Sequence, residues 1–451
     1  MNGLVFPMKV RLNSLFLFAA AAALPLAVHA QTRPAPAAPT PAKPAAAKPV
    51  AAPSAAAQPA APGAQPAVQP PAPPPLPPAI WDQRNAVDLL SFIQQIGVEG
   101  LNPADYDPDT LMAAIASGDP LRMSAEATDR FNRVSSDLAL GHVKRSQRID
   151  WHVKDPDLDA ASQDTMLRAA LAQHNVAGAL RNLLPTHPQY AALKAALASA
   201  SPADTAKLSR IRLNMDRWRW LPRDLGEKYV IVNVPAFYAT LVENGVTRWK
   251  QRAIAGSVKT PTPQLTAMAT GVILNPWWEV PTSISKEVAG KNGFVGVKGK
   301  DGKIQRWRQP PGPTNALGQM KFVMYNQYNI YLHDTNARSR FNGQVRALSH
   351  GCIRTQNIHD LAAELGSDDG GEWTRDHIDQ VLATSKTVEA KFVKPVPVYI
   401  VYFSSAALND GTIIDYKDLY GRDTKVIAAL LDKKPAVSKA KPTQTATKSQ
   451  T

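Results

Sequence analysis

The chain of 451 residues has 51 lysines and arginines, 37 aspartates and glutamates, and a formal net charge of +14. This charge gathers at the ends: residues 1–79 and 433–451 hold five cations each and no acid, which leaves 14 − 10 = +4 for the body. The body is therefore too weakly basic for a duplex-binding face, and we expect no nucleic-acid partner.

The N-terminus has the pattern of a secretory signal over residues 1–30. Lys9 and Arg11 precede an apolar run at 15–24, and small residues lead up to a cleavage position after Ala30. The mature protein is therefore expected outside the cytoplasm. The apolar run is shorter than the roughly 20 residues of a membrane span, so we expect membrane anchoring only if the signal stays uncleaved.

Two further stretches have compositions that do not support a packed core. Residues 31–79 are almost entirely Pro and Ala with Gln and a few cations, which predicts a semi-rigid disordered spacer. In residues 433–451, lysines alternate with Pro, Ala, Ser and Thr, which predicts a disordered basic tail.

Residues 80–206 predict a helical module. Apolar residues recur at helical spacing in residues 85–96, 109–115, 125–140, 165–174, 176–184 and 190–199. The module contains no paired carboxylates and no ligand-spaced His or Cys, so its expected role is to pack against or present another part of the protein. Residues 209–222 predict a connecting helix with an apolar side and an arginine side, which ends at Pro222.

The periodicity then changes to that of strands, which predicts a mainly β domain over residues 227–432 and an α+β fold for the chain. The strand-like runs are residues 229–235, 238–243, 247–255, 268–275, 321–332 and 396–403. Residues 282–310 interrupt them with a segment rich in Lys and Gly. A loop of that length inside a compact domain is either functional or disordered, so we expect a lid that opens for a bulky substrate.

The densest group of reactive side chains lies within residues 331–354. Cys352 is the only cysteine of the chain, and His333 precedes it by 352 − 333 = 19 positions. The strand pattern places His333 at a strand end and Cys352 at a strand-to-helix transition, ahead of a helix that begins near Gln356 or Asn357. A helix N-terminus and a nearby imidazole both lower the pKa of a thiol, and Gly351 lets backbone N–H groups approach an oxyanion. This arrangement predicts acyl transfer through a thioester.

Two other interpretations of these residues stay open. The first is a metal site built from His333, His350 and Cys352, although neither a Cys-x-x-Cys nor a His-Glu-x-x-His spacing supports it. The second is purely structural, with His350 and Cys352 packed in the fold as ordinary side chains.

At this point the sequence resembles the L,D-transpeptidases with the YkuD-type catalytic domain. The resemblance rests on His333, the run Ser349-His-Gly-Cys-Ile-Arg354 and Asn357. Residues 215–222, 232–235, 309–322 and 331–335 are similar to the larger, scaffold-bearing YcbB-like branch, and the resemblance covers roughly residues 80–430. One departure is that residues 193–197 lead almost directly to 210–214, without the small peptidoglycan-binding domain that is common in that branch.

The resemblance implies a periplasmic enzyme that needs no cofactor and attacks the third residue of a peptidoglycan tetrapeptide stem. Cys352 would be the nucleophile and His333 the base, its imidazole oriented by a backbone carbonyl. The amides of Gly351 and Cys352 would form the oxyanion hole. Ser349, His350, Arg354 and Asn357 would shape the site, and Tyr331, Asp334 and Trp278 are the expected substrate contacts.

The amine of a second stem would then resolve the thioester into a 3→3 cross-link. A lipoprotein lysine, a free D-amino acid and water remain alternative acceptors, and carbapenems are expected to acylate the same cysteine. The helical module could bring in other cell-wall synthesis proteins. A catalytically silent wall-binding scaffold is the alternative from a different functional class.

Overall fold

The computed structural model describes residues 77–154, 157–408 and 410–431. The predicted signal (1–30), the spacer up to residue 76 and the basic tail (433–451) lie outside the described residues. None of the helices in the described ranges is both long and apolar enough to cross a membrane.

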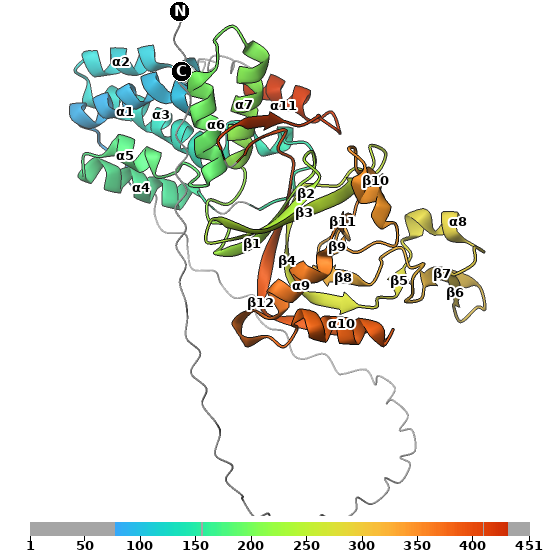
Figure 1. The fold of residues 1–451 in the computed structure, drawn as a ribbon. Helices are drawn as coiled ribbons and strands as arrows, with labels where there is room; N and C mark the ends of the chain where they lie inside the picture. The colour runs from blue at the N-terminus through green and yellow to red at the C-terminus, as the bar shows by residue number, and fades with distance from the viewer. Residues whose placement is uncertain (1–76, 155–156, 409, 432–451) are drawn as a thin grey trace, which may run out of the picture. The chain divides into compact units, whose positions relative to one another are not determined.

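The first part of the described chain is helical, as predicted. Its α-helices are α1 (Gln83–Gln95), α2 (Pro108–Ala116), α3 (Pro120–Leu140), α4 (Ala160–Ala172) and α5 (Val176–Arg181), joined by 3₁₀ turns η1 (Ile96–Glu99), η2 (Pro103–Tyr106) and η3 (Arg145–Gln147) (Figure 1). Asp119 caps α3 by accepting the N–H groups of Leu121 and Arg122, and Pro120 follows at the first helical position. Trp81, Leu89, Phe131 and their apolar neighbours form one buried cluster that holds these helices together.

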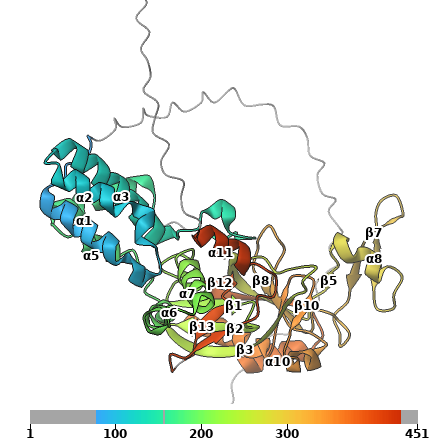
Figure 2. The ribbon, with the colours of Figure 1, turned by 90° about the horizontal axis from the view of Figure 1, so that it is seen from above.

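A second helical group connects this module to the β domain. It consists of α6 (Pro188–Ser199), α7 (Thr205–Trp218) and α11 (Asp423–Leu431), next to the small sheet of β13 (Ser405–Ala407) and β14 (Ile413–Asp415). Figure 2 shows α11 beside α7, where Val426 and Leu430 join a buried cluster with Ile211. This cluster also contains Tyr399 and Val401 of the β domain.

The connecting helix predicted at 209–222 is α7, but its limits differ from the prediction. Asp204 accepts the N–H of Lys207, so the helix begins at Thr205. It ends at Trp218, four positions before Pro222, because a proline has no N–H to donate to the Trp218 carbonyl.

The β domain is built on a nine-stranded sheet in the order β10-β3-β11-β9-β8-β4-β12-β1-β2. Because β2 also pairs with β3, the sheet closes on itself. Its strands are β1 (Lys228–Asn233), β2 (Tyr238–Glu243), β3 (Val246–Gly256), β4 (Leu265–Leu274), β8 (Met320–Val323), β9 (Leu332–His333), β10 (Ala347–Ser349), β11 (Ile353–Thr355) and β12 (Val388–Val401). The predicted fold class, a helical part followed by a mainly β part, is confirmed.

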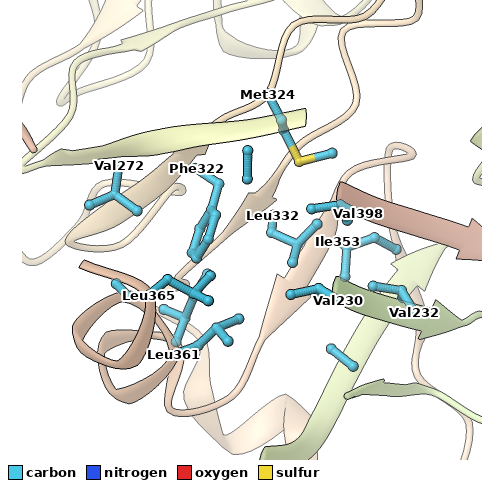
Figure 3. Packing of buried hydrophobic residues seen from close by; sticks show 14 of the residues in the cluster. Val230, Val232, Val272, Phe322, Met324, Leu332, Ile353, Leu361, Leu365 and Val398 are labelled. Carbon is cyan, nitrogen blue, oxygen red and sulfur yellow. The ribbon is translucent and has the colours of Figure 1, made fainter. Parts of the chain in front are cut away.

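The sheet encloses a hydrophobic core. Val230, Phe322, Leu332 and Ile353 point into it from different strands, as Figure 3 shows. Helix α9 (Ile358–Gly366) adds Leu361 and Leu365 to the same cluster, and α10 (Arg375–Ala383) packs against α9. Each fully buried side chain of this size stabilises the fold by about 1.5–3 kcal/mol, so the core fixes the strands that carry the site.

The predicted lid has secondary structure of its own. It contains η4 (Thr282–Ile284), α8 (Ser285–Val288) and a three-stranded sheet in the order β5-β7-β6, made of β5 (Trp278–Glu279), β6 (Val295–Lys298) and β7 (Ile304–Gln309) (Figure 1). Val280, Ile284 and Val288 form a small core against Trp278, Phe294 and Trp307. The segment is thus a small folded unit that begins before residue 282, because Trp278 pairs with Gln309. The remaining 3₁₀ turns are η5 (Arg338–Asn342) and η6 (Asp368–Gly370).

Candidate active site

The strand register brings the two ends of the reactive segment together. Strand β9 pairs in parallel with β11, so that Leu332 lies opposite Ile353 and His333 lies opposite Arg354. Side chains alternate along a strand, and Leu332 and Ile353 belong to the core. His333 and Arg354 therefore share the outer surface of the sheet. Lys321 of β8 pairs with His333 and lies on that surface too.

Cys352 lies in the turn between β10 and β11 and is partly exposed. Its thiol donates to the backbone oxygen of Asn329 over 3.5 Å. The backbone and the hydroxyl of Tyr331 hydrogen-bond to the sulfur, and the cations of Lys321 and Arg354 act on it. These contacts place the sulfur among the side chains that share the surface with His333.

The predicted helix after Cys352 is present and begins close to its expected start near Gln356 or Asn357, but Cys352 does not lie at its N-terminus. Strand β11 intervenes, and α9 begins only at Ile358, 358 − 352 = 6 residues later. The field of a helix terminus falls off within its first turn, so it does not activate this thiol. The pKa shift is also opposite to the prediction, because burial raises the pKa of the Cys352 thiol while Tyr331, Lys321 and Arg354 offset part of the shift.

His333 is buried, with 5% of its surface exposed. Burial and the neighbouring Arg354 guanidinium lower the pKa of its imidazole to about 3, while the backbone carbonyls of Leu317 and Asp334 oppose the shift. Within the described part of the chain, Nδ1 of His333 has no hydrogen-bond partner. The imidazole is therefore neutral near pH 7, and the carbonyls nearby suit the expected orienting contact.

Hydrogen bonds fix the turn that presents Cys352. The Ser349 hydroxyl donates to the Cys352 carbonyl over 2.6 Å and accepts the N–H of Gly351 over 3.1 Å. Thr262 donates to the Gly351 carbonyl over 2.7 Å, and Thr260 donates to the Ser349 carbonyl over 3.0 Å. Gly351 has φ of +122°, a conformation that favours glycine. The N–H of Gly351 donates to the Ser349 hydroxyl, so in this structure it shapes the turn. This differs from the expected role of the Gly351 N–H as a donor to the oxyanion.

The sequence of this domain matches a known family. Residues 227–390 match the family model of the L,D-transpeptidase catalytic domain, YkuD, and residues 77–197 match that of the scaffold domain. The chain contains a YkuD L,D-transpeptidase catalytic domain.

The chain is similar to a curated protein and to solved structures. A curated L,D-transpeptidase relative from Haemophilus influenzae is 30% identical over 243 residues, which is 48% of each chain, so the chain spans about half the length of that relative. Among solved structures, an L,D-transpeptidase from Mycobacterium smegmatis is 15% identical, with 39% of this chain and 58% of that chain covered and a TM-score of 0.21. The catalytic domain of the E. faecium L,D-transpeptidase acylated by ertapenem is 14% identical, with 40% and 99% covered and a TM-score of 0.20.

Two predicted residues connect the site around Cys352 to the predicted lid. Trp278 of β5 hydrogen-bonds to the hydroxyl of Tyr331, which itself contacts the thiol. His350 is exposed, and its Nε2 lies 3.6 Å from a carboxylate oxygen of Glu287 on α8. The structure therefore brings Trp278, Tyr331 and His350 together with Cys352, at the boundary between the site and the lid.

Two other predicted residues lie in a separate cavity of about 180 Å³. Asp334 is buried and accepts hydrogen bonds from the Gln319 amide over 2.9 Å and from Arg338 over 3.0 Å, with His359 at 3.8 Å. Asn357 lines the same cavity and precedes α9 with φ of +49°, without a side-chain capping bond. Their side chains therefore support the strand and helix next to the site and do not join the group around the sulfur.

The sequence interpretation missed Lys321. Its ammonium lies 5.3 Å from the centre of the Tyr331 ring, and burial lowers its pKa while the Cys352 thiolate would raise it. The available signal was a lysine between Met320 and Phe322 in an otherwise apolar strand. This lysine alone did not indicate a functional residue, because only the pairing of Lys321 with His333 shows which side of the sheet its side chain lies on.

The structure does not bring together the ligands of the predicted metal alternative. Within residues 77–154, 157–408 and 410–431, no group of three or more His, Cys, Asp or Glu side chains could hold a metal ion. His333 is buried next to Arg354 and Tyr331, whereas Nε2 of the exposed His350 lies 3.6 Å from Glu287.

Proposed function

We propose that this protein is a periplasmic peptidoglycan L,D-transpeptidase that forms 3→3 cross-links through a thioester on Cys352. The observation that supports this most is the Cys352 thiol beside Tyr331, Lys321 and Arg354, on the sheet surface that also carries the neutral His333, inside a YkuD domain. A nucleophile, a base and nearby cations are the groups that acyl transfer requires.

The pKa shifts indicate how the nucleophile is activated. Burial raises the pKa of Cys352 and lowers that of His333 to about 3, so both groups are neutral in the resting enzyme. A preformed thiolate–imidazolium pair is therefore disfavoured. The proton passes from sulfur to the imidazole as the sulfur attacks, which makes His333 a general base.

Attack on the carbonyl of the third stem residue forms a C–S bond and an oxyanion. The N–H of Cys352 is the proposed donor to this oxyanion, and Lys321 and Arg354 stabilise the negative charge that develops on the sulfur. The C–N bond to D-alanine then breaks, and the leaving amine takes the proton held by His333. The amine of a second stem loses a proton to His333, attacks the thioester and releases the thiol.

The lid controls access to this site. Trp278 and Glu287 contact Tyr331 and His350, and both contacts involve polar groups that a substrate can replace. The lid has its own small core, so it can open as a unit without disturbing the core of the sheet. Opening admits the two peptide stems, and closing excludes water from the thioester.

Product analysis tests the proposed function. Purified protein is incubated with a disaccharide-tetrapeptide alone and with a lipoprotein-derived lysine peptide or a free D-amino acid as acceptor, and products are identified by mass spectrometry. We expect a cross-linked dimer and free D-alanine. Release of tripeptide alone would show that the enzyme hydrolyses the stem and does not cross-link it. Exclusive transfer to another amine would identify that amine as the acceptor. The absence of any product under all conditions would contradict the enzymatic function.

A further inference from the structure

A second cavity, of about 480 Å³, lies between the N-terminus of α6 and strands β1 to β3, away from Cys352. This volume is within the range of pockets that bind small ligands. The side chains that the following argument uses are His187, Trp218, Tyr238, Thr240, Lys250 and Tyr416.

The strand register places this cavity and the catalytic residues on the same surface of the sheet. Tyr238 pairs with Arg252, and Thr240 pairs with Lys250. Two positions along β3 from Arg252, Ile254 pairs with Arg354, which in turn pairs with His333. Because paired residues point to the same side, the cavity and the site occupy neighbouring parts of one surface.

The walls of the cavity are held rigidly. His187 stacks on Trp218 at 4.1 Å, and Trp218 stacks on Phe403 at 4.5 Å. Asn233 exchanges hydrogen bonds with the backbone of Phe403 over 3.0 and 2.9 Å, and Gln189 exchanges two of 2.7 Å with Ala407. A ligand therefore meets a preformed surface, and ordering the protein costs little of the binding free energy.

The chemistry of the lining indicates the class of ligand. It combines aromatic rings with the hydroxyls of Thr240, Thr247 and Tyr416, and it contains no carboxylate. Burial lowers the pKa of His187 to about 4, so Lys250 is the one cation of the lining near pH 7. A single cation is too little for a polyphosphate, and the lack of acids disfavours a basic peptide. A pyranose has an apolar face and a ring of hydroxyls, which match such walls.

We propose that this cavity is a subsite for the glycan strand of peptidoglycan, an inference that rests on the proposed function. Lys250 in the cavity and Ile254 are separated by about 13 Å along β3. His333 lies two strands away from Ile254, and each strand-to-strand spacing is about 5 Å. The first three residues of an extended stem span only about 10 Å. The cavity therefore binds a sugar next to the one that bears the donor stem.

Substitutions that fill the cavity test this proposal. Thr240 is half-buried and Thr247 is exposed, and both line the cavity, so Thr240→Trp and Thr247→Trp each place an indole in the cavity. Thr165→Trp, on the exposed surface of α4, is the matched control. Binding of a peptide-free tetrasaccharide of alternating N-acetylglucosamine and N-acetylmuramic acid is measured by calorimetry. Thermal unfolding of each variant verifies that it folds.

We expect Thr240→Trp and Thr247→Trp to weaken tetrasaccharide binding by at least about tenfold, or 1.4 kcal/mol, and Thr165→Trp to bind like the wild type. The ratio of kcat/KM for a glycan-linked tetrapeptide to that for a free tetrapeptide should fall in parallel. Equal binding by wild type and both cavity variants, or no binding by the wild type, would overturn the subsite even if turnover persists. Binding without any turnover would instead refute the proposed enzymatic function and leave the subsite standing.

Discussion

At Cys352 and His333, burial acts on both side chains in the same sense, because it favours the neutral form of each. The thiol pKa rises and the imidazole pKa falls to about 3. The nearby cations then act differently on the two groups, because Arg354 favours a thiolate but disfavours an imidazolium. The charge of Arg354 therefore acts on the pKa of both the nucleophile and the base, and it lowers both.

The pH profile of Arg354→Met tests this electrostatic arrangement. In the wild type, His333 gains a proton only as the pH falls toward about 3, so kcat/KM should keep its value well below pH 6.5 and drop at the acid end. Removing the guanidinium raises the pKa of His333 and should move this acid limb to higher pH. An unchanged acid limb in the variant, with the fold intact by circular dichroism, would contradict the proposed role of His333.

At the scale of elements, the sequence predicted the kinds of structure better than their mutual positions. The alternation of apolar residues in 229–235 was enough to indicate a strand, and the spacing in 85–96 was enough to indicate a helix. The strand-like run predicted at 321–332 is instead two short strands, β8 and β9, joined by a turn. The sequence could not show that β11 separates Cys352 from α9, because a strand of three residues is too short to show a periodic pattern.

Side-chain direction was equally out of reach of the sequence. Asp334 follows His333 directly, yet its carboxylate binds Gln319 and Arg338 in another cavity. Lys321 joins the site only through the pairing of β8 with β9, which places it opposite His333, 333 − 321 = 12 positions further along the chain. Local patterns specify local structure, whereas these positions depend on long-range pairing.

The lid is the element whose removal has the clearest expected effect. Deleting residues 291–304 removes β6 and the following turn but keeps the pairing of Trp278 with Gln309. Turnover of polymeric peptidoglycan should fall by about tenfold or more, because the thioester is left open to water. The midpoint of thermal unfolding should stay within a few degrees, since the lid core is separate from that of the sheet. Lys300→Ala, an exposed change in the same turn, is the control, and unchanged turnover after the deletion would refute a lid function.

At the scale of the whole molecule, buried polar contacts tie the helical module to α7. Asp216 accepts the N–H groups of His142 and Val143 over 2.7 and 3.2 Å, and the indole N–H of Trp220 over 2.9 Å. Its neighbour Arg219 is fully buried and donates to the Tyr190 hydroxyl over 2.6 Å and to the Glu99 carbonyl. Through α7 these contacts connect the helical module to the cluster shared with the β domain.

Asp216→Asn tests this connection. The variant removes the carboxylate that forms an ion pair with the buried Arg219 and leaves Glu99 as the other acid that acts on this charge, so the free energy of unfolding should fall by about 3–5 kcal/mol in urea. Asp369→Asn, which breaks an exposed pair with Lys394, should cost less than about 1 kcal/mol. Equal effects of the two substitutions would show that the Asp216 contacts do not hold the module in place.

The central claim is that Cys352 carries the acyl group, and intact-mass spectrometry tests it most directly. Wild-type protein is mixed with a tetrapeptide stem or with a carbapenem and quenched in acid, and the site of any adduct is located by peptide mapping, with Cys352→Ala as the matched variant. We predict one tripeptide acyl group, or one opened β-lactam, on Cys352 of the wild type and neither on Cys352→Ala. An adduct that persists in the variant, or a wild type that releases D-alanine with no adduct at Cys352, would contradict the mechanism.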